Sequence, residues 1–191
     1  MSFADQIRAR LLPLGGRLAR AGVSADALTL FGLTLAIAAG TLVAIGQPLW
    51  ALALFTGSLL CDGLDGATAR ASGRARPAGA ILDALSDRIG ELALIAGIAL
   101  AANAPLLGAL AAGSAALPSY LRARSREVGI DALAGPLDRG GRGLVALIGL
   151  ILTAAAVSWA LSATLLVIAA GSLLTAARRA RLIAQAFSAK N

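Results

Sequence analysis

Four aspartates lie close together in a chain that is otherwise strongly apolar. Asp62 and Asp65 are three positions apart, and Asp83 and Asp87 are four positions apart. On helices, these spacings place the two carboxylates of each pair on one face. Charged side chains are costly inside a membrane, so acids between long apolar segments indicate a function.

Converging carboxylates repel one another unless cations lie between them. Oxygen ligands suit Mg²⁺, Mn²⁺ or Ca²⁺ rather than zinc. Two divalent ions would neutralise four aspartates and could bridge the phosphate oxygens of a substrate. The chain contains no histidine, so metal binding and acid–base chemistry must rely on carboxylates. The four aspartates therefore predict a divalent-metal site.

The composition is that of a membrane protein with several spans. The 191 residues are 58% hydrophobic and 14% charged, whereas a soluble domain would carry about a quarter charged residues. The net charge is +7, and arginines supply nearly all of the positive charge. These arginines lie between apolar segments, which favours lipid headgroups or phosphorylated substrates as partners. Aromatic residues make up only 4%, which argues against a nucleic-acid partner.

The hydropathy pattern predicts an all-α integral membrane protein with six transmembrane helices. Before them, an amphipathic helix over residues 3–20 is expected to lie in the membrane interface, because its apolar residues recur three and four positions apart. Ser24 is expected to cap the first span. The spans are predicted at residues 26–46, 48–70, 79–101, 105–126, 142–157 and 160–182. Three regions follow: an interfacial helix over 1–22, a catalytic transmembrane domain over 23–185, and a tail over 186–191.

All charges fall on one side of this predicted arrangement. The connections at 46–48, 102–105 and 157–160 contain no charged residue. The positive-inside rule therefore places both termini and the aspartates on the cytoplasmic side, and a bacterial inner membrane is expected. Helical rise places Asp62 about 21 Å into a hydrocarbon core about 30 Å thick, and Asp83 and Asp87 about 6–12 Å from its cytoplasmic side. The four carboxylates are thus expected at a similar depth.

Small and basic residues accompany the aspartates. Gly63, Gly66 and Gly79 would let a bulky ligand approach the backbone, or would serve close helix packing instead. Arg70 lies eight positions after Asp62 on the same predicted helix and could clamp a phosphate. Glu91 is expected to support the site from one turn beyond Asp87 or to pair with Arg88 three positions earlier.

One block of the sequence resembles the signature of the CDP-alcohol phosphotransferase family. The block is Asp62-x2-Asp65-Gly66-x2-Ala69-Arg70-x8-Gly79-x3-Asp83-x3-Asp87, and it agrees with that signature at every defined position. The resemblance implies that a CDP-linked lipid, typically CDP-diacylglycerol, donates a phosphatidyl group to a small alcohol while CMP leaves. It also implies a membrane enzyme that is commonly a homodimer.

The resemblance assigns roles to the residues of this block. Asp62, Asp65 and Asp83 would bind two divalent ions, Mg²⁺ or Mn²⁺, with Asp87 beside them. Asp87 would also be the general base that deprotonates the acceptor hydroxyl. The residues that would bind the CDP part of the donor are Asp62, Gly66, Ala69, Arg70 and Gly79.

A second stretch bears on the acceptor alcohol. Residues 119–124, Ser-Tyr-Leu-Arg-Ala-Arg, resemble a run in phosphatidylinositol-phosphate synthases, which use a basic pocket for the phosphate of inositol phosphate. Arg139 and Arg142 belong to residues 138–142, which stand where those synthases have a basic segment. The resemblance of both stretches implies a phosphorylated acceptor bound by Arg122, Arg124, Arg139 and Arg142. Glycerol 3-phosphate is the competing acceptor. The alternative for each arginine is topological anchoring on the cytoplasmic side.

Two other functions would also place acids in membrane spans. A divalent-cation transporter or channel is one, because intramembrane aspartates often mark ion paths. Transport sites usually lie near the midplane with access from both sides, whereas here the charges are confined to one side, which favours an interfacial enzyme. The other is a structural role in which the aspartates pair with nearby arginines.

Overall fold

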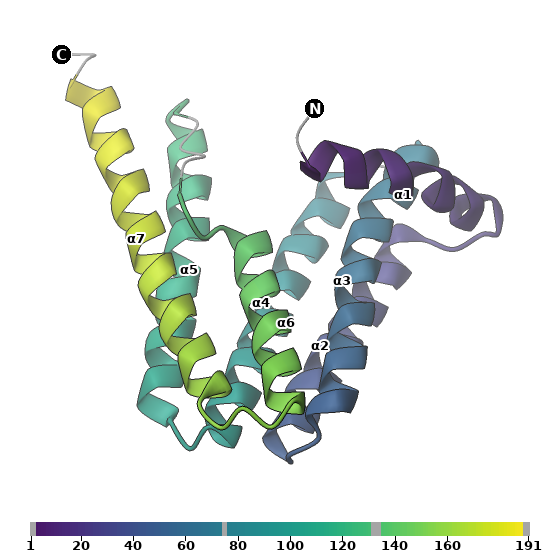
Figure 1. Cartoon of the computed structure of the whole chain (residues 1–191). Coiled ribbons are helices and arrows are strands. Elements are labelled where there is room, and N and C mark those ends of the chain that lie inside the picture. Colours follow the sequence, from purple (N-terminus) through teal and green to yellow (C-terminus); the bar gives the residue numbers. More distant parts are fainter. Residues whose placement is uncertain (1–2, 74–75, 131–134, 189–191) are drawn as a thin grey trace. The chain divides into compact units, whose positions relative to one another are not determined.

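A computed structural model describes residues 3–73, 76–130 and 135–188 of the chain. In these ranges the chain forms seven α-helices and no strand (Figure 1). They are α1 (Phe3–Arg20), α2 (Ala25–Ala44), α3 (Pro48–Ala71), α4 (Pro77–Ala101), α5 (Pro105–Glu127), α6 (Arg139–Ala154) and α7 (Ala160–Ser188). The predicted all-α fold is confirmed. Helix α1 covers the residues predicted for the first helix, and α2–α7 overlap the six segments predicted to span the membrane.

Short-range signals set where the helices begin. Ser24 accepts a hydrogen bond from the backbone N–H of Ala27 at 3.1 Å, which confirms it as a capping residue. Helices α3, α4 and α5 each begin with a proline, which lacks an N–H and has a backbone angle suited to the first turn.

The last two helices differ most from the predicted spans. Helix α6 begins three residues before the predicted span at 142, because the Asp138 side chain accepts a hydrogen bond from the Gly141 N–H at 2.9 Å and caps the helix there. Helix α7 continues through Ser188, since its final residues are good helix formers without glycine or proline. The predicted tail over 186–191 therefore begins inside α7, and its residues 189–191 lie outside the described ranges.

The described chain divides into two compact units. Unit 1 contains α1, α2 up to Thr41, α3 from Trp50, and α4 up to Leu94. Unit 2 contains residues 42–49, the end of α4 from Ile95, and helices α5, α6 and α7.

Glycines allow the helices of unit 1 to pack closely. A Cβ at Gly40 of α2 would lie 2.4 Å from the backbone oxygen of Ala93 in α4. A Cβ at Gly32 of α2 would lie 3.0 Å from the Cβ of Cys61 in α3. Helix α2 therefore packs closely on both helices that carry the aspartates.

Helix α1 lies across the end of α3 that carries Asp62 and Asp65 (Figure 1). A Cβ at Gly15 of α1 would lie 2.6 Å from the carbonyl carbon of Ala67, and a Cβ at Gly63 would lie 2.8 Å from Leu11 Cδ1. Gly63 thus receives a side chain of α1. This contact explains Gly63 by helix packing rather than by approach of a ligand.

In unit 2, α5 and α6 both pack on α7. The crossing of α6 and α7 is close, since a Cβ at Gly149 would lie 1.9 Å from Thr164 Oγ1. The segment before α6 is tied to α7 because the Thr175 hydroxyl accepts from the Leu137 N–H at 3.0 Å. The Arg179 guanidinium donates to the carbonyl oxygen of Pro118 in α5 at 2.5 Å. Helix α7 therefore organises this unit.

Many large apolar side chains are exposed along the helices, while several polar ones are buried. Leu106 of α5, Ile81 of α4 and Trp50 of α3 are 82%, 68% and 65% exposed, whereas Asp65, Arg142 and Arg179 are buried. Extensive apolar surface of this kind marks an interaction with lipid or with protein. By length and composition, α2 and α7 could each cross a membrane.

Candidate active site

Three of the four predicted aspartates come together in unit 1. One carboxylate oxygen each from Asp62 of α3 and from Asp83 and Asp87 of α4 lies within 4.8 Å of the others, and all three side chains are half-buried. Their helices are joined by a short connection, so the two pairs are neighbours in space. We call these three residues the carboxylate cluster. Its oxygen donors suit a hard divalent cation.

Asp65 has a different environment from the other three aspartates. It is buried, with Oδ2 accepting from the Thr29 hydroxyl at 2.6 Å and Oδ1 accepting from the Gly66 N–H at 2.5 Å. It interacts electrostatically with Asp83 and Asp62. Asp65 therefore lies beside the carboxylate cluster and is held by α2.

The residues predicted to bind the donor occupy the same unit. A Cβ at Gly66 would lie 3.2 Å from Arg70 Nη1, so the Arg70 guanidinium folds back toward Gly66. A Cβ at Gly79 would lie 3.5 Å from the Asp26 carboxylate. Glu91, one turn beyond Asp87, forms an ion pair with Arg88 at 2.5 Å, which is one of the two roles expected for it.

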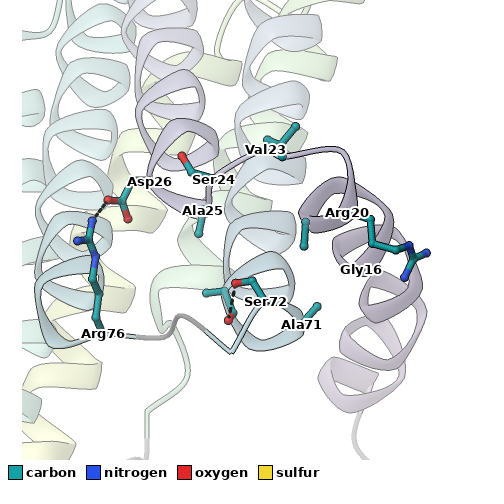
Figure 2. A pocket seen from close by; sticks show the side chains of 12 residues that line it. Gly16, Arg20, Val23, Ser24, Ala25, Asp26, Ala71, Ser72 and Arg76 are labelled. Atoms are coloured by element: carbon teal, nitrogen blue, oxygen red, sulfur yellow. Dashed lines mark hydrogen bonds and ion pairs between the residues drawn. The ribbon is translucent and has the colours of Figure 1, made fainter.

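A cleft of about 940 Å³ opens beside Ala69 of the predicted donor set (Figure 2). It lies between the last turns of α1, the connection from α1 to α2, and the end of α3. Asp26 and Arg76 form an ion pair at one side of the cleft. The sequence signal for this cleft is the stretch 23–26 at the entry to α2, which was not among the predicted site residues.

Arginines gather in unit 2. Arg122 of α5 and Arg142 of α6 interact electrostatically with Arg179 of α7, as does Asp138. Arg142 and Arg179 are only 2% and 3% exposed. We call Arg122, Arg142 and Arg179 the arginine cluster. Like charges held this closely attract an anion, and guanidinium groups match phosphate oxygens in geometry.

The other two predicted acceptor residues are placed differently. Arg124 is exposed and forms an ion pair with Glu127 at 2.5 Å. Arg139 is the first residue of α6 and is half-buried.

Sequence reasoning had missed Arg179. The signal that could have identified it is the regular spacing of polar residues along α7, all of which are buried: Thr164, Ser172, Thr175 and Arg179. This spacing of three and four positions, and their multiples, continues one helix face into the basic segment.

Sequence comparison identifies relatives over most of the chain. The sequence model described as CDP-alcohol phosphatidyltransferase matches residues 23–188. The chain is 34% identical to the archaetidylinositol phosphate synthase of Methanothermobacter thermautotrophicus, over 88% of this chain and 85% of that protein. It is also 34% identical to the phosphatidylinositol phosphate synthase of Mycobacteroides abscessus, over 87% of this chain and 80% of that protein.

The fold is also similar to solved structures of a phosphatidylinositol phosphate synthase. The phosphatidylinositol phosphate synthase of Mycobacterium tuberculosis in complex with manganese and citrate has a TM-score of 0.80 and 26% identity, over 91% of this chain and 88% of that chain. The same enzyme with CDP-DAG bound has a TM-score of 0.79 and 27% identity, over 91% of this chain and 92% of that chain. All of these proteins are synthases, so the transporter or channel alternative is set aside.

Proposed function

This chain belongs to the CDP-alcohol phosphatidyltransferase family, and we propose that it transfers a phosphatidyl group from CDP-diacylglycerol to inositol phosphate. The observation that carries this proposal is the convergence of Asp62, Asp83 and Asp87, whose oxygens lie within 4.8 Å of one another. Relatives named phosphatidylinositol phosphate synthase favour inositol phosphate over glycerol 3-phosphate as the acceptor.

The carboxylate cluster and Asp65 would hold divalent cations, Mg²⁺ or Mn²⁺ and two in number. The donor set fits, because it consists only of carboxylate oxygens on two adjacent helices, and the similar Mycobacterium tuberculosis structure contains manganese. When bound, such ions neutralise the pyrophosphate and stabilise the leaving phosphate. The residues of the chain hold the donor and acceptor in position around this chemistry.

Asp87 would be the general base of the transfer. It would take the proton of the acceptor hydroxyl while the hydroxyl oxygen forms a bond to the phosphorus of the phosphatidyl group. The bond between that phosphorus and the CMP oxygen breaks, and CMP leaves with the electron pair. A positioned carboxylate can act in this way because held geometry contributes much of the rate.

The donor nucleotide would lie at the end of α3. Asp62, Gly66, Ala69, Arg70 and Gly79 would bind its CDP part, with Arg70 as a phosphate clamp. The cleft beside Ala69, of about 940 Å³, is of the size that small-molecule sites usually have. A similar solved structure holds CDP-DAG, which supports this donor.

The acceptor phosphate would bind to arginines of unit 2. Arg122, Arg124, Arg139 and Arg142 were the sequence candidates, and Arg179 joins them because it interacts with Arg122 and Arg142. Charge-assisted hydrogen bonds from guanidinium groups to phosphate are short and strong. Arg124, which pairs with Glu127 on the surface, would contribute least.

We place the protein in a bacterial inner membrane with six spans, α2–α7. The 16 residues of α6 make it about 24 Å long, slightly shorter than the hydrocarbon core, while outward apolar residues along the helices support lipid contact. Helix α1, within residues 1–22, would lie in the cytoplasmic interface, and residues 23–185 would form the catalytic domain. A homodimer is expected, and chemical cross-linking in native membranes would test it.

A panel of acceptors tests the proposed function. Purified protein with Mn²⁺ or Mg²⁺ and CDP-diacylglycerol is given inositol phosphate, glycerol 3-phosphate, inositol, serine or choline, and CMP release is measured. We expect CMP release with inositol phosphate and little with the unphosphorylated alcohols. Preference for glycerol 3-phosphate would make the product phosphatidylglycerophosphate. No CMP release with any acceptor would overturn the enzyme assignment.

A further inference from the structure

We propose that Thr29 is a positioning residue, which holds the Asp65 carboxylate in the orientation that a divalent cation at this site needs. The inference rests on the proposed function only in taking Asp65 as a ligand. Thr29 lies on α2, outside the signature block of residues 62–87, and its hydroxyl is 2.6 Å from Asp65 Oδ2. Both side chains are buried, so the hydrogen bond is shielded from water.

The contacts of Thr29 differ from those of other helical threonines. Thr34, Thr41 and Thr56 each donate to the carbonyl oxygen four residues earlier, at 2.8–3.1 Å. The Thr29 hydroxyl oxygen lies 3.1 Å from the equivalent carbonyl oxygen, that of Ala25, and 2.6 Å from Asp65 Oδ2, so the carboxylate is the closer acceptor. A hydroxyl has one proton, and the shorter, charge-assisted bond to a carboxylate is the stronger one. We therefore assign the Thr29 proton to Asp65.

Asp65 needs such a donor because it is the most buried of the four aspartates. It is 6% exposed and interacts with the like charges of Asp83 and Asp62. A buried carboxylate without hydrogen bonds is costly. The Thr29 hydroxyl and the Gly66 N–H each bond one oxygen of Asp65, which fixes the rotation of the carboxylate plane. Without the hydroxyl, repulsion would be free to turn Asp65 away from its neighbours.

Two hydrogen bonds leave Asp65 able to coordinate a cation. An ionised carboxylate has about four acceptor positions, and the Thr29 and Gly66 bonds occupy two of them. Hydrogen bonds to ligating carboxylates orient them, and loss of such a partner typically costs about 10- to 100-fold in metal affinity or activity. Thr29 therefore acts on the cation through Asp65.

Metal affinity measured without substrates tests this role. The full chain in detergent is titrated with Mn²⁺, and free Mn²⁺ is followed by electron paramagnetic resonance. We expect Thr29→Val to weaken Mn²⁺ binding by about 10- to 100-fold, and Thr29→Ser, which keeps the hydroxyl, to stay within about threefold of the wild type. Thr34→Val on the same helix is the matched control and should bind normally. Wild-type affinity in Thr29→Val would overturn the proposal.

A double-mutant cycle separates positioning from a general structural effect. If Thr29 acts through Asp65, adding Thr29→Val to Asp65→Asn should weaken Mn²⁺ binding by less than about threefold, because contacting residues are not additive. Full additivity would contradict the proposal. Thr29→Ala and the thermal unfolding of each metal-free variant are measured alongside, so that a folding defect in one variant does not decide the outcome. CMP release is not a readout here, so failure of the transferase assignment would appear only in the acceptor panel.

Discussion

The carboxylate cluster and the arginine cluster are assembled in opposite ways. Asp62, Asp83 and Asp87 come from two helices joined by one short connection, and their side chains remain half-buried. Arg122, Arg142 and Arg179 come from three helices, and the last two side chains are almost completely buried. The comparison shows that a site built from adjacent segments can be anticipated from spacing alone. A site built from distant segments requires the tertiary structure.

The two clusters also differ in what they need from a ligand. Half-buried carboxylates on adjacent helices can exchange cations with solvent, since each keeps part of its surface accessible. Buried arginines repel one another in a medium that screens charge weakly, and a phosphate would relieve that repulsion. We therefore expect substitutions in unit 1 to affect the chemical step and those in unit 2 to affect acceptor binding.

The largest effect is expected at Asp87. Asp87→Asn keeps the size of the side chain but removes the base, so turnover should fall at least about 10³-fold, within the range of general base catalysis. Binding of CDP-diacylglycerol, measured by retention of the labelled lipid, should remain detectable. Retained turnover would remove the role of Asp87 as base and would weaken the functional contrast between the two clusters.

A smaller effect is expected at Arg179. Arg179→Ala should raise the KM for inositol phosphate by about 10- to 100-fold, because a hydrogen bond to a charged group contributes about 1.5–3 kcal/mol. The kcat should change by less than about threefold if Arg179 binds the ground and transition states alike. Steady-state kinetics over a range of inositol phosphate concentrations would measure both constants.

Arg178, the exposed neighbour of Arg179, provides the control for this test. Arg178→Ala should leave the KM unchanged while removing the same charge from the same helix. Arg179 also bonds to Pro118, so thermal unfolding of both variants must accompany the kinetics. Equal KM changes in the two variants would indicate a general effect of charge and would remove Arg179 from the acceptor site.

A moderate effect on stability is expected where α1 packs on α3, the helix that carries Asp62 of the carboxylate cluster. Gly15→Ala would place a Cβ 2.6 Å from the backbone of Ala67, and overpacking of this kind destabilises by about 1–3 kcal/mol. Gly16→Ala is the matched control, since its Cβ would contact only the flexible side chain of Arg20, with Nη1 at 3.6 Å. We expect thermal unfolding in detergent at a lower temperature for Gly15→Ala only. Equal behaviour of the two variants would show that α1 is not held by this contact.

Much of unit 1 could be predicted from the sequence because its signals are local. The spacing of apolar residues predicted α1, and the capping serine predicted the start of α2. The spacing of the acids by three and four positions predicted that carboxylates of α3 and α4 converge, as they do in the carboxylate cluster. The contact of Thr29 with Asp65 could not be predicted, because it depends on how α2 crosses α3. The same holds for Gly63, whose packing against Leu11 cannot be distinguished from ligand access in sequence alone.

Less of unit 2 was accessible to sequence reasoning. In the sequence, Arg179 looks like part of a basic end of the chain, because Arg178 and Arg181 lie close to it. In the structure, these two neighbours are exposed and Arg179 is buried. Arg179 is buried because α5 and α6 pack on α7, and this packing cannot be read from the sequence. The start of α6 was also misplaced, because the Gly140-Gly141 pair obscured the capping role of Asp138.

The smallest effect is expected at Arg124, and it tests whether burial or sequence resemblance identifies the acceptor residues. Arg124 belongs to the run at 119–124, but its side chain is exposed and paired with Glu127. Exposed ion pairs contribute about 0–1 kcal/mol, so Arg124→Ala should change the KM for inositol phosphate by less than about threefold. Arg142→Ala, at a buried position in the arginine cluster, should raise that KM by at least about tenfold, as expected for loss of a bond between charged groups. An Arg124 effect as large as that of Arg142 would mean that the acceptor site extends to the exposed end of α5, and burial would no longer separate binding arginines from anchoring ones.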